Sequence, residues 1–166
     1  MRRTLRGLLL AALIAAVVVP VSPAARHATP PKAFTVTHGP VVLTYVDAGT
    51  PGPSVGDVYY ASILGKGPGG QDVRVVGGLT TVAEDTPTPG MEIRTTNLVF
   101  MFPNAQDQIQ IGGASVYAKT AQTRPTQSVT VRPIVGGSGA YAGARGWCVT
   151  VHYANGNWAH TFHFTS

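Results

Sequence analysis

The residues best suited to chemistry in this chain are a cysteine and two histidines near its end. Cys148, His152 and His163 lie in two neighbouring segments, and a thiolate with two imidazoles could bind a transition metal. No CxxC or HExxH spacing accompanies them. A Cys–His nucleophilic pair would also need a third, orienting group, which the sequence does not identify. We favour their interpretation as ordinary strand residues, and we expect no metal and no cofactor.

Two charged residues, Asp47 and Arg145, form the second candidate set. Only 11% of the chain is charged, and both residues lie in or beside apolar segments. Because a buried charge is costly unless it is paired, they are mutual partners, functional residues, or simply exposed. Other catalytic signatures are missing from the sequence: it contains no GxSxG elbow and no Walker loop, and its seven acids are scattered.

The first 24 residues have the pattern of a secretory signal. Arg2, Arg3 and Arg6 precede an uncharged run from Gly7 to Val19, and Pro20 ends that run. The run is shorter than the ~20 residues of a spanning helix, although an uncleaved anchor is the alternative, and the Arg2–Arg3 pair leaves Sec or twin-arginine export open. We expect a secreted protein without a stable membrane span once the signal is cleaved.

Loss of this segment changes what the charge implies about partners. It carries three of the 12 basic residues and none of the acids, so the formal net charge falls from +5 to +2. No cluster of Lys and Arg remains that could follow a phosphate backbone. We therefore expect no nucleic-acid partner.

The elements that must position these residues are strands. Residues 25–40 are predicted to form an exposed leader, followed by a single domain over 41–166. Gly and Pro together number 33, and β-branched or aromatic runs alternate with turn-rich stretches. The predicted strands are 41–46, 57–64, 72–84, 92–102, 108–118, 128–135, 146–153 and 157–164. Eight strands with short connections are typical of an antiparallel sandwich or barrel.

The last two strands allow a register to be predicted. Asn155-Gly156 favours a two-residue type I′ turn, which would pair Tyr153 with Trp158. His160 would then lie on an apolar packing face, and Cys148, His152 and His163 would share the opposite, polar face.

The segment Arg132-Pro-Ile-Val-Gly-Gly-Ser-Gly-Ala-Tyr-Ala-Gly-Ala-Arg-Gly146 resembles the signature of dirigent proteins and allene oxide cyclases. Val55 to Leu64, which contains Gly-Asp and then aromatic residues, is similar to the second strand of that superfamily. Gln108 to Tyr117 is similar to its fifth strand. The three matches occur in the family's order and span nearly the whole chain after the predicted signal.

This resemblance implies an all-β fold, an eight-stranded antiparallel β-barrel of the allene oxide cyclase/dirigent-like, calycin-like type, often assembled as a homotrimer. Such barrels hold a hydrophobic or aromatic small molecule in one geometry, which is catalysis by proximity. The resemblance also implies the site residues: Arg145 and Asp47 as catalytic residues, with Tyr59, Tyr60, Ser62 and Tyr141 binding the substrate. Strand alternation lets only one of Tyr59 and Tyr60 face inward.

Two functions follow as hypotheses. The first is an exported barrel that binds a hydrophobic or aromatic molecule and steers its cyclisation or coupling, as a cofactor-independent cyclase or isomerase. The alternative is a non-catalytic secreted carrier, or a structural or interaction barrel. Ala140 stands where dirigent proteins often have Asp, which favours the alternative somewhat.

Overall fold

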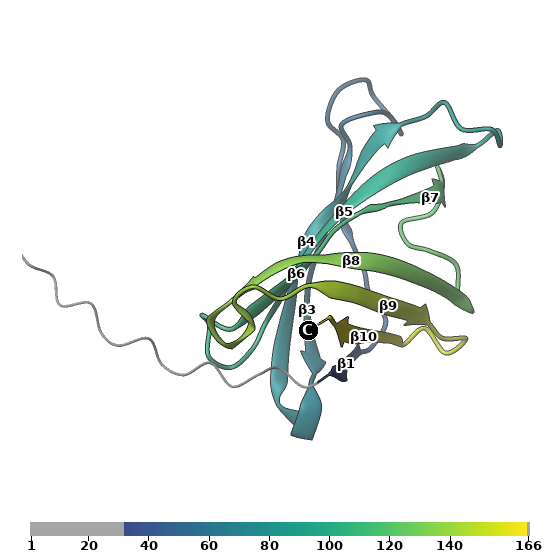
Figure 1. The fold of residues 1–166 in the computed structure, drawn as a ribbon. Coiled ribbons are helices and arrows are strands. Elements are labelled where there is room, and N and C mark those ends of the chain that lie inside the picture. Colours follow the sequence, from purple (N-terminus) through teal and green to yellow (C-terminus); the bar gives the residue numbers. More distant parts are fainter. Residues whose placement is uncertain (1–31, 166) are drawn as a thin grey trace, which may run out of the picture.

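Short runs of β-branched and aromatic residues form ten strands in the part of the chain that the structure describes. This computed structural model describes residues 32–165 (Figure 1), so the predicted signal over 1–24 lies outside the described residues. The strands, with two short 3-10 helices among them, are β1 (Ala33–His38), β2 (Thr44–Val46), β3 (Val58–Lys66), η1 (Pro68–Gly70), β4 (Asp72–Ala83), β5 (Met91–Met101), β6 (Gln108–Ile111), β7 (Ala114–Ala118), β8 (Ser128–Ser138), η2 (Gly139–Tyr141), β9 (Gly146–His152) and β10 (Trp158–Phe164).

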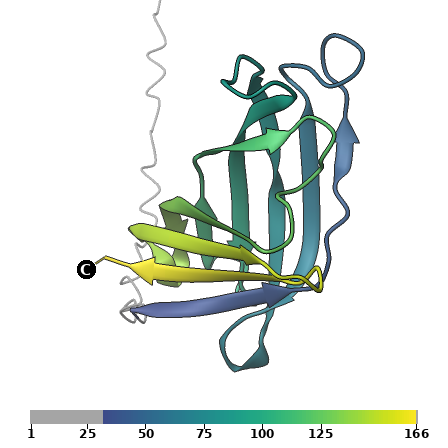
Figure 2. The same cartoon turned by 90° about the vertical axis from the view of Figure 1, so that its right-hand side faces the viewer.

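The strands close into an antiparallel barrel with eight positions. Hydrogen-bonded neighbours follow the order β1, β10, β9, β8, β6, β5, β4, β3, and the pairing of Thr37 with Lys66 joins β1 to β3. β2 also pairs with β3, and β7 also pairs with β5, so each continues the position of the strand before it (Figure 2). The predicted eight-stranded antiparallel β-barrel is confirmed.

The interior of the barrel is polar in one part and apolar in another. Because side chains alternate along a strand, each strand sends every second residue inward. Along β5 the buried residues begin with Glu92, Arg94 and Thr96 and end with Phe100. Phe100 belongs to a large apolar cluster, whereas a smaller cluster consists of Leu43, Tyr59, Leu79 and Tyr117. The polar residues of the interior are therefore gathered in one part of it.

The structure corrects the predicted boundary of the leader. Residues 33–38 were expected to be part of an exposed leader over 25–40, but they form β1, which pairs with β10 from Ala33–His163 to His38–Trp158. Val36 on this strand is fully buried. The segment looked irregular because Pro30, Pro31 and Pro40 surround it, yet its Phe-Thr-Val-Thr core alternates as a strand does.

The register of the last hairpin also differs from the prediction. Trp158 pairs with His152 and His160 with Thr150, one residue away from the type I′ register. Tyr153 N–H donates to the Asn157 carbonyl, and Gly156 has φ +83°, as in a three-residue loop that ends in a left-handed glycine. The additional loop residue puts Cys148 on the same face of the hairpin as His160, and both residues are buried.

In residues 32–165 the structure shows no helix of the length and apolarity that a bilayer crossing requires.

Candidate functional site

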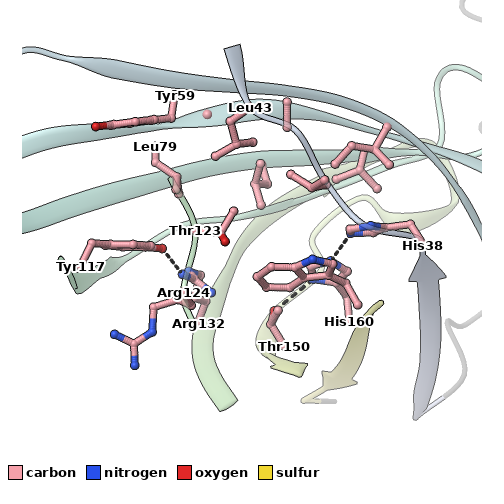
Figure 3. Close-up of a pocket in the computed structure, with 17 residues that line it drawn as sticks. His38, Leu43, Tyr59, Leu79, Tyr117, Thr123, Arg124, Arg132, Thr150 and His160 are labelled. Atoms are coloured by element: carbon pink, nitrogen blue, oxygen red, sulfur yellow. Dashed lines mark hydrogen bonds between the residues drawn. The ribbon is translucent and has the colours of Figure 1, made fainter. Parts of the chain in front are cut away.

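A pocket opens among the inward-facing side chains of the barrel (Figure 3). Its cavity volume is about 70 Å³, several times the ~10–15 Å³ that one water requires. Most of the wall is aliphatic or aromatic, and it combines residues from all eight barrel positions with residues of the connecting loops. The lining residues are His38, Val41, Leu43, Tyr59, Ala61, Ile63, Val75, Gly78, Leu79, Leu98, Tyr117, Thr123, Arg124, Arg132, Thr150, Trp158 and His160.

Arg132 brings a positive charge into this wall from β8. Its side chain is nearly buried, with 5% of the residue exposed. Its Nε donates to Oγ1 of Thr96 at 3.0 Å, and its Nη2 donates to the phenol oxygen of Tyr117 at 2.9 Å. Both acceptors are hydroxyl oxygens. All seven acidic side chains lie within residues 32–165, and none of them forms an ion pair with Arg132.

A second buried arginine, Arg94, is neutralised. Its Nε donates to Oε1 of Glu92 at 2.5 Å, and both side chains are completely buried. The guanidinium carbon of Arg94 lies 3.8 Å from the ring centre of Tyr59 and 4.9 Å from that of Tyr117, which is cation–π geometry. The Glu92–Arg94 pair therefore holds the two tyrosines that form one wall of the pocket.

Two histidines and a threonine form a hydrogen-bonded chain on the other side (Figure 3). Nδ1 of His38 is 2.7 Å from the Gly39 carbonyl, its Nε2 is 3.0 Å from Nε2 of His160, and Nδ1 of His160 is 3.0 Å from Oγ1 of Thr150. A carbonyl only accepts, so His38 donates through Nδ1 and accepts from His160 through Nε2. Thr150 in turn donates to His160, and every nitrogen is satisfied with both rings neutral.

Burial keeps these rings neutral. Desolvation, with smaller contributions from His38 and the positive Arg132, lowers the pKa of His160 to about 3. Desolvation also lowers the pKa of His38, although its bond to the Gly39 carbonyl opposes this and His152 adds to it. At neutral pH the His38–His160–Thr150 chain is therefore hydrogen-bonded throughout and carries no charge.

Of the six residues that the sequence assigned to a site, the structure places one in this pocket. Tyr59 is buried in the wall, whereas its neighbour Tyr60 is 51% exposed on the outside of β3. Ser62 is exposed on the same strand. This follows from alternation along β3.

The other three candidates lie elsewhere and do not meet. Asp47 is exposed after β2 and accepts a hydrogen bond from the Gly52 N–H. Arg145 is exposed, and its Nη1 donates to the carbonyl of Ala144. Tyr141, in η2, is half-buried against the large apolar cluster, with its ring centre 4.7 Å from that of Phe102.

Sequence reasoning missed Arg132 and the His38–His160–Thr150 chain. The pattern of β8 was misleading, because the valines that alternate with Arg132 face outward: Val129 is 60% and Val131 62% exposed. His160 was correctly expected on the packing face of β10, but the predicted register put Thr150 on the opposite face, and His38 lay in the predicted leader. The useful signal was the apolar–polar alternation of Ser128–Ile134, with its polar side turned inward.

Of the three residues considered as metal ligands, Cys148 and His152 are buried on the inner face of β9, whereas His163 lies on the other side of the barrel wall. Cys148 points inward, whereas His163 stacks on Trp147 with ring centres 5.1 Å apart, and Trp147 is 43% exposed. Among residues 32–165 no group of three or more His, Cys, Asp or Glu side chains is arranged to hold a metal ion. Burial raises the pKa of Cys148 to about 12, so its thiol is a packing group.

The sequence matches no protein-family model and no curated protein. Its fold, however, is similar to that of solved structures. One, a pyocyanin demethylase, superposes with a TM-score of 0.60 over 80% of this chain and 99% of that chain, at 20% identity. Another, a pterocarpan synthase dirigent protein, gives 0.52 over 88% and 96%, at 14% identity. The chain therefore shares its barrel fold with these two structures, and this is the fold that the resemblance in its Gly-rich segment implied.

Proposed function

We propose that this protein binds a hydrophobic or aromatic small molecule inside the barrel and holds it in one geometry for cyclisation or coupling. The observation that carries the proposal is the pocket itself, in which aliphatic and aromatic walls surround one buried cation, Arg132. A wall of this kind excludes water and restricts the ligand, while the cation can stabilise charge that develops on an oxygen atom.

The wall also suits a flat ligand. Trp158 lines the pocket and stacks on His152 with ring centres 3.8 Å apart, so its plane is fixed. Tyr59 is fixed on its side by Arg94. Rigid aromatic side chains lose little conformational entropy when they contact a ligand, which supports a shape-selecting role.

The two solved structures of similar fold carry names that concern small molecules, pyocyanin in one case and a pterocarpan in the other. These names describe those proteins. They support the choice of small-molecule transformation over a purely structural role here, while the substrate must be found by experiment.

The test is native mass spectrometry of the protein as recovered from its exporting host, followed by identification of any molecule released from it. That molecule is then incubated with fresh protein and followed by chromatography. We expect retention and conversion in the wild type and loss of both in Leu79→Trp, which fills the pocket. Val82→Trp, the same change at an exposed position of the same strand, is the matched control.

Retention without conversion would support the alternative function, a secreted carrier. Loss of retention in Val82→Trp as well would contradict the assignment of binding to the pocket. Export belongs to the same proposal: the mass of the protein recovered outside the cytoplasm should correspond to a chain cleaved near Ala24.

We propose further that the barrels associate as homotrimers through the outer face of β8 and β9. On this face Val129, Val131, Val135 and Trp147 are all exposed, and a contiguous apolar patch of this kind marks an interaction surface more often than it does a free surface.

A further inference from the structure

The interior of this barrel treats its two buried arginines differently. Arg94 is paired with Glu92, so its positive charge is neutralised by an adjacent carboxylate. Arg132, nearly as buried, contacts only hydroxyl groups, those of Thr96, Tyr117 and, at 3.5 Å, Ser115. Burial of a charge without a counter-charge is strongly unfavourable, and hydroxyl groups compensate only part of that cost.

One end of the Arg132 guanidinium remains available. Nε and Nη2 donate to the hydroxyls named above, whereas Nη1 has no acceptor among residues 32–165. Nη1 keeps some accessible surface, and Arg132 lines the cavity. Its two N–H groups can serve an oxygen atom inside the pocket.

Among residues 32–165, no carboxylate lines the pocket. The ionisable residues that line the pocket are His38, His160, Tyr59, Tyr117, Arg124 and Arg132. The two histidines are neutral in their hydrogen-bonded chain, and Arg124 adds a second cation, whose guanidinium carbon lies 5.9 Å from the ring centre of Tyr117. The pocket therefore has mostly apolar walls and carries a positive charge.

We propose that the natural ligand is a hydrophobic acid, an aromatic or polycyclic molecule that carries one ionised oxygen, and that this oxygen binds Nη1 of Arg132. The inference rests on the proposed small-molecule function and adds the ligand's charge and its anchor. The ring system lies between the aliphatic wall and Trp158. The ligand thus pairs with Arg132 as Glu92 pairs with Arg94.

The experiment compares two probes of nearly equal shape, 2-naphthoate and 2-naphthamide, by calorimetric titration of the full-length protein at pH 7.5. The wild type should bind the naphthoate at least about tenfold more tightly, because a hydrogen bond between ions is worth more than one to a neutral amide. Arg132→Met should remove this preference, because it weakens naphthoate binding much more than naphthamide binding. Retained naphthamide binding also reports that the variant is folded.

Two further variants complete the design. Arg132→Lys keeps the charge and should keep part of the preference, whereas Arg74→Met removes an exposed arginine of β4 and should keep all of it. Equal affinity of the wild type for the two probes would overturn the inference while leaving the proposed function in place. If the wild type binds neither probe, that result contradicts both the inference and the proposed function. A preference that survives Arg132→Met would assign the anion to another residue.

Discussion

His160 shows how the barrel interior sets the chemistry of a single residue. In an unfolded chain this imidazole takes up a proton below about pH 6.5. In the barrel it is 3% exposed, accepts from Thr150 and donates to His38, and burial lowers its pKa to about 3. Between these two pH values the unfolded state binds the proton and the folded state does not. Stability must therefore fall as the pH is lowered through this window.

The corresponding prediction concerns acid sensitivity. His160 should cost the folded state about 2 kcal/mol of unfolding free energy when the pH falls from 7 to 5, as follows from an unfolded pKa near 6.5. Urea titrations at the two pH values should show a loss in His160→Gln that is smaller than the wild-type loss by this amount, whatever the absolute stability of the variant. An equal loss in both proteins would contradict a neutral, buried His160.

At the scale of elements, the Gly-rich segment that carried the resemblance has a mechanical role. Gly146, where β9 begins, has φ +137°, and a Cβ atom there would lie 1.9 Å from the carbonyl oxygen of His163 on β10. Gly139 has φ +58°, and its Cβ would lie 2.1 Å from a carboxylate oxygen of Asp107. These glycines allow neighbouring strands to approach and the chain to turn. The motif thus marks a fold, and the pocket is built by other residues.

This gives a prediction with an internal control. Gly146→Ala should lower the free energy of unfolding by about 2–4 kcal/mol, because both the backbone angle and the close approach exclude a side chain. Gly136→Ala, on β8, should change it by less than about 1 kcal/mol, since a Cβ there would meet nothing within 4 Å. Denaturant unfolding of the two variants provides the comparison, and similar losses in both would contradict it.

At the scale of the whole molecule, closure of the barrel depends on its first strand. β1 pairs with β10 along six residues and reaches β3 at Thr37–Lys66, and it contributes Val36 and His38 to the interior. Without it, β10 and β3 would each present an open edge, and an open edge promotes association with other chains.

A chain that begins at Lys32 should therefore unfold in one cooperative thermal transition. A chain that begins at Gly39 should lose that transition and aggregate. Circular dichroism melting with light scattering distinguishes the two, and a cooperative transition in the shorter chain would show that closure through β1 is dispensable.

The proposed homotrimer is tested at the same scale. Light scattering coupled to size-exclusion chromatography should give three chain masses for the wild type and one for Val131→Lys, because a charge would be buried in an apolar interface. Val42→Lys, which alters a valine that is 89% exposed before β2, should remain trimeric. A wild type that elutes as a monomer would contradict the proposal.

The sequence by itself determined most of the strand pattern and carried the Gly-rich signature, and the resemblance of that signature implied the barrel. These are local properties: period-two alternation and turn chemistry can be read within a dozen residues. For the same reason the sequence also predicted that one of Tyr59 and Tyr60 faces inward, although only the structure shows that it is Tyr59.

Only the tertiary structure decided which face of each strand is the interior, and with it the site. One additional residue in the β9–β10 loop put Cys148 and Thr150 on the same inner face as His160, and the exposed valines of β8 hid the inward direction of Arg132. A pocket joins residues as distant as His38 and His160, which are 122 positions apart. No local pattern carries that information, because the contact exists only once the barrel has closed.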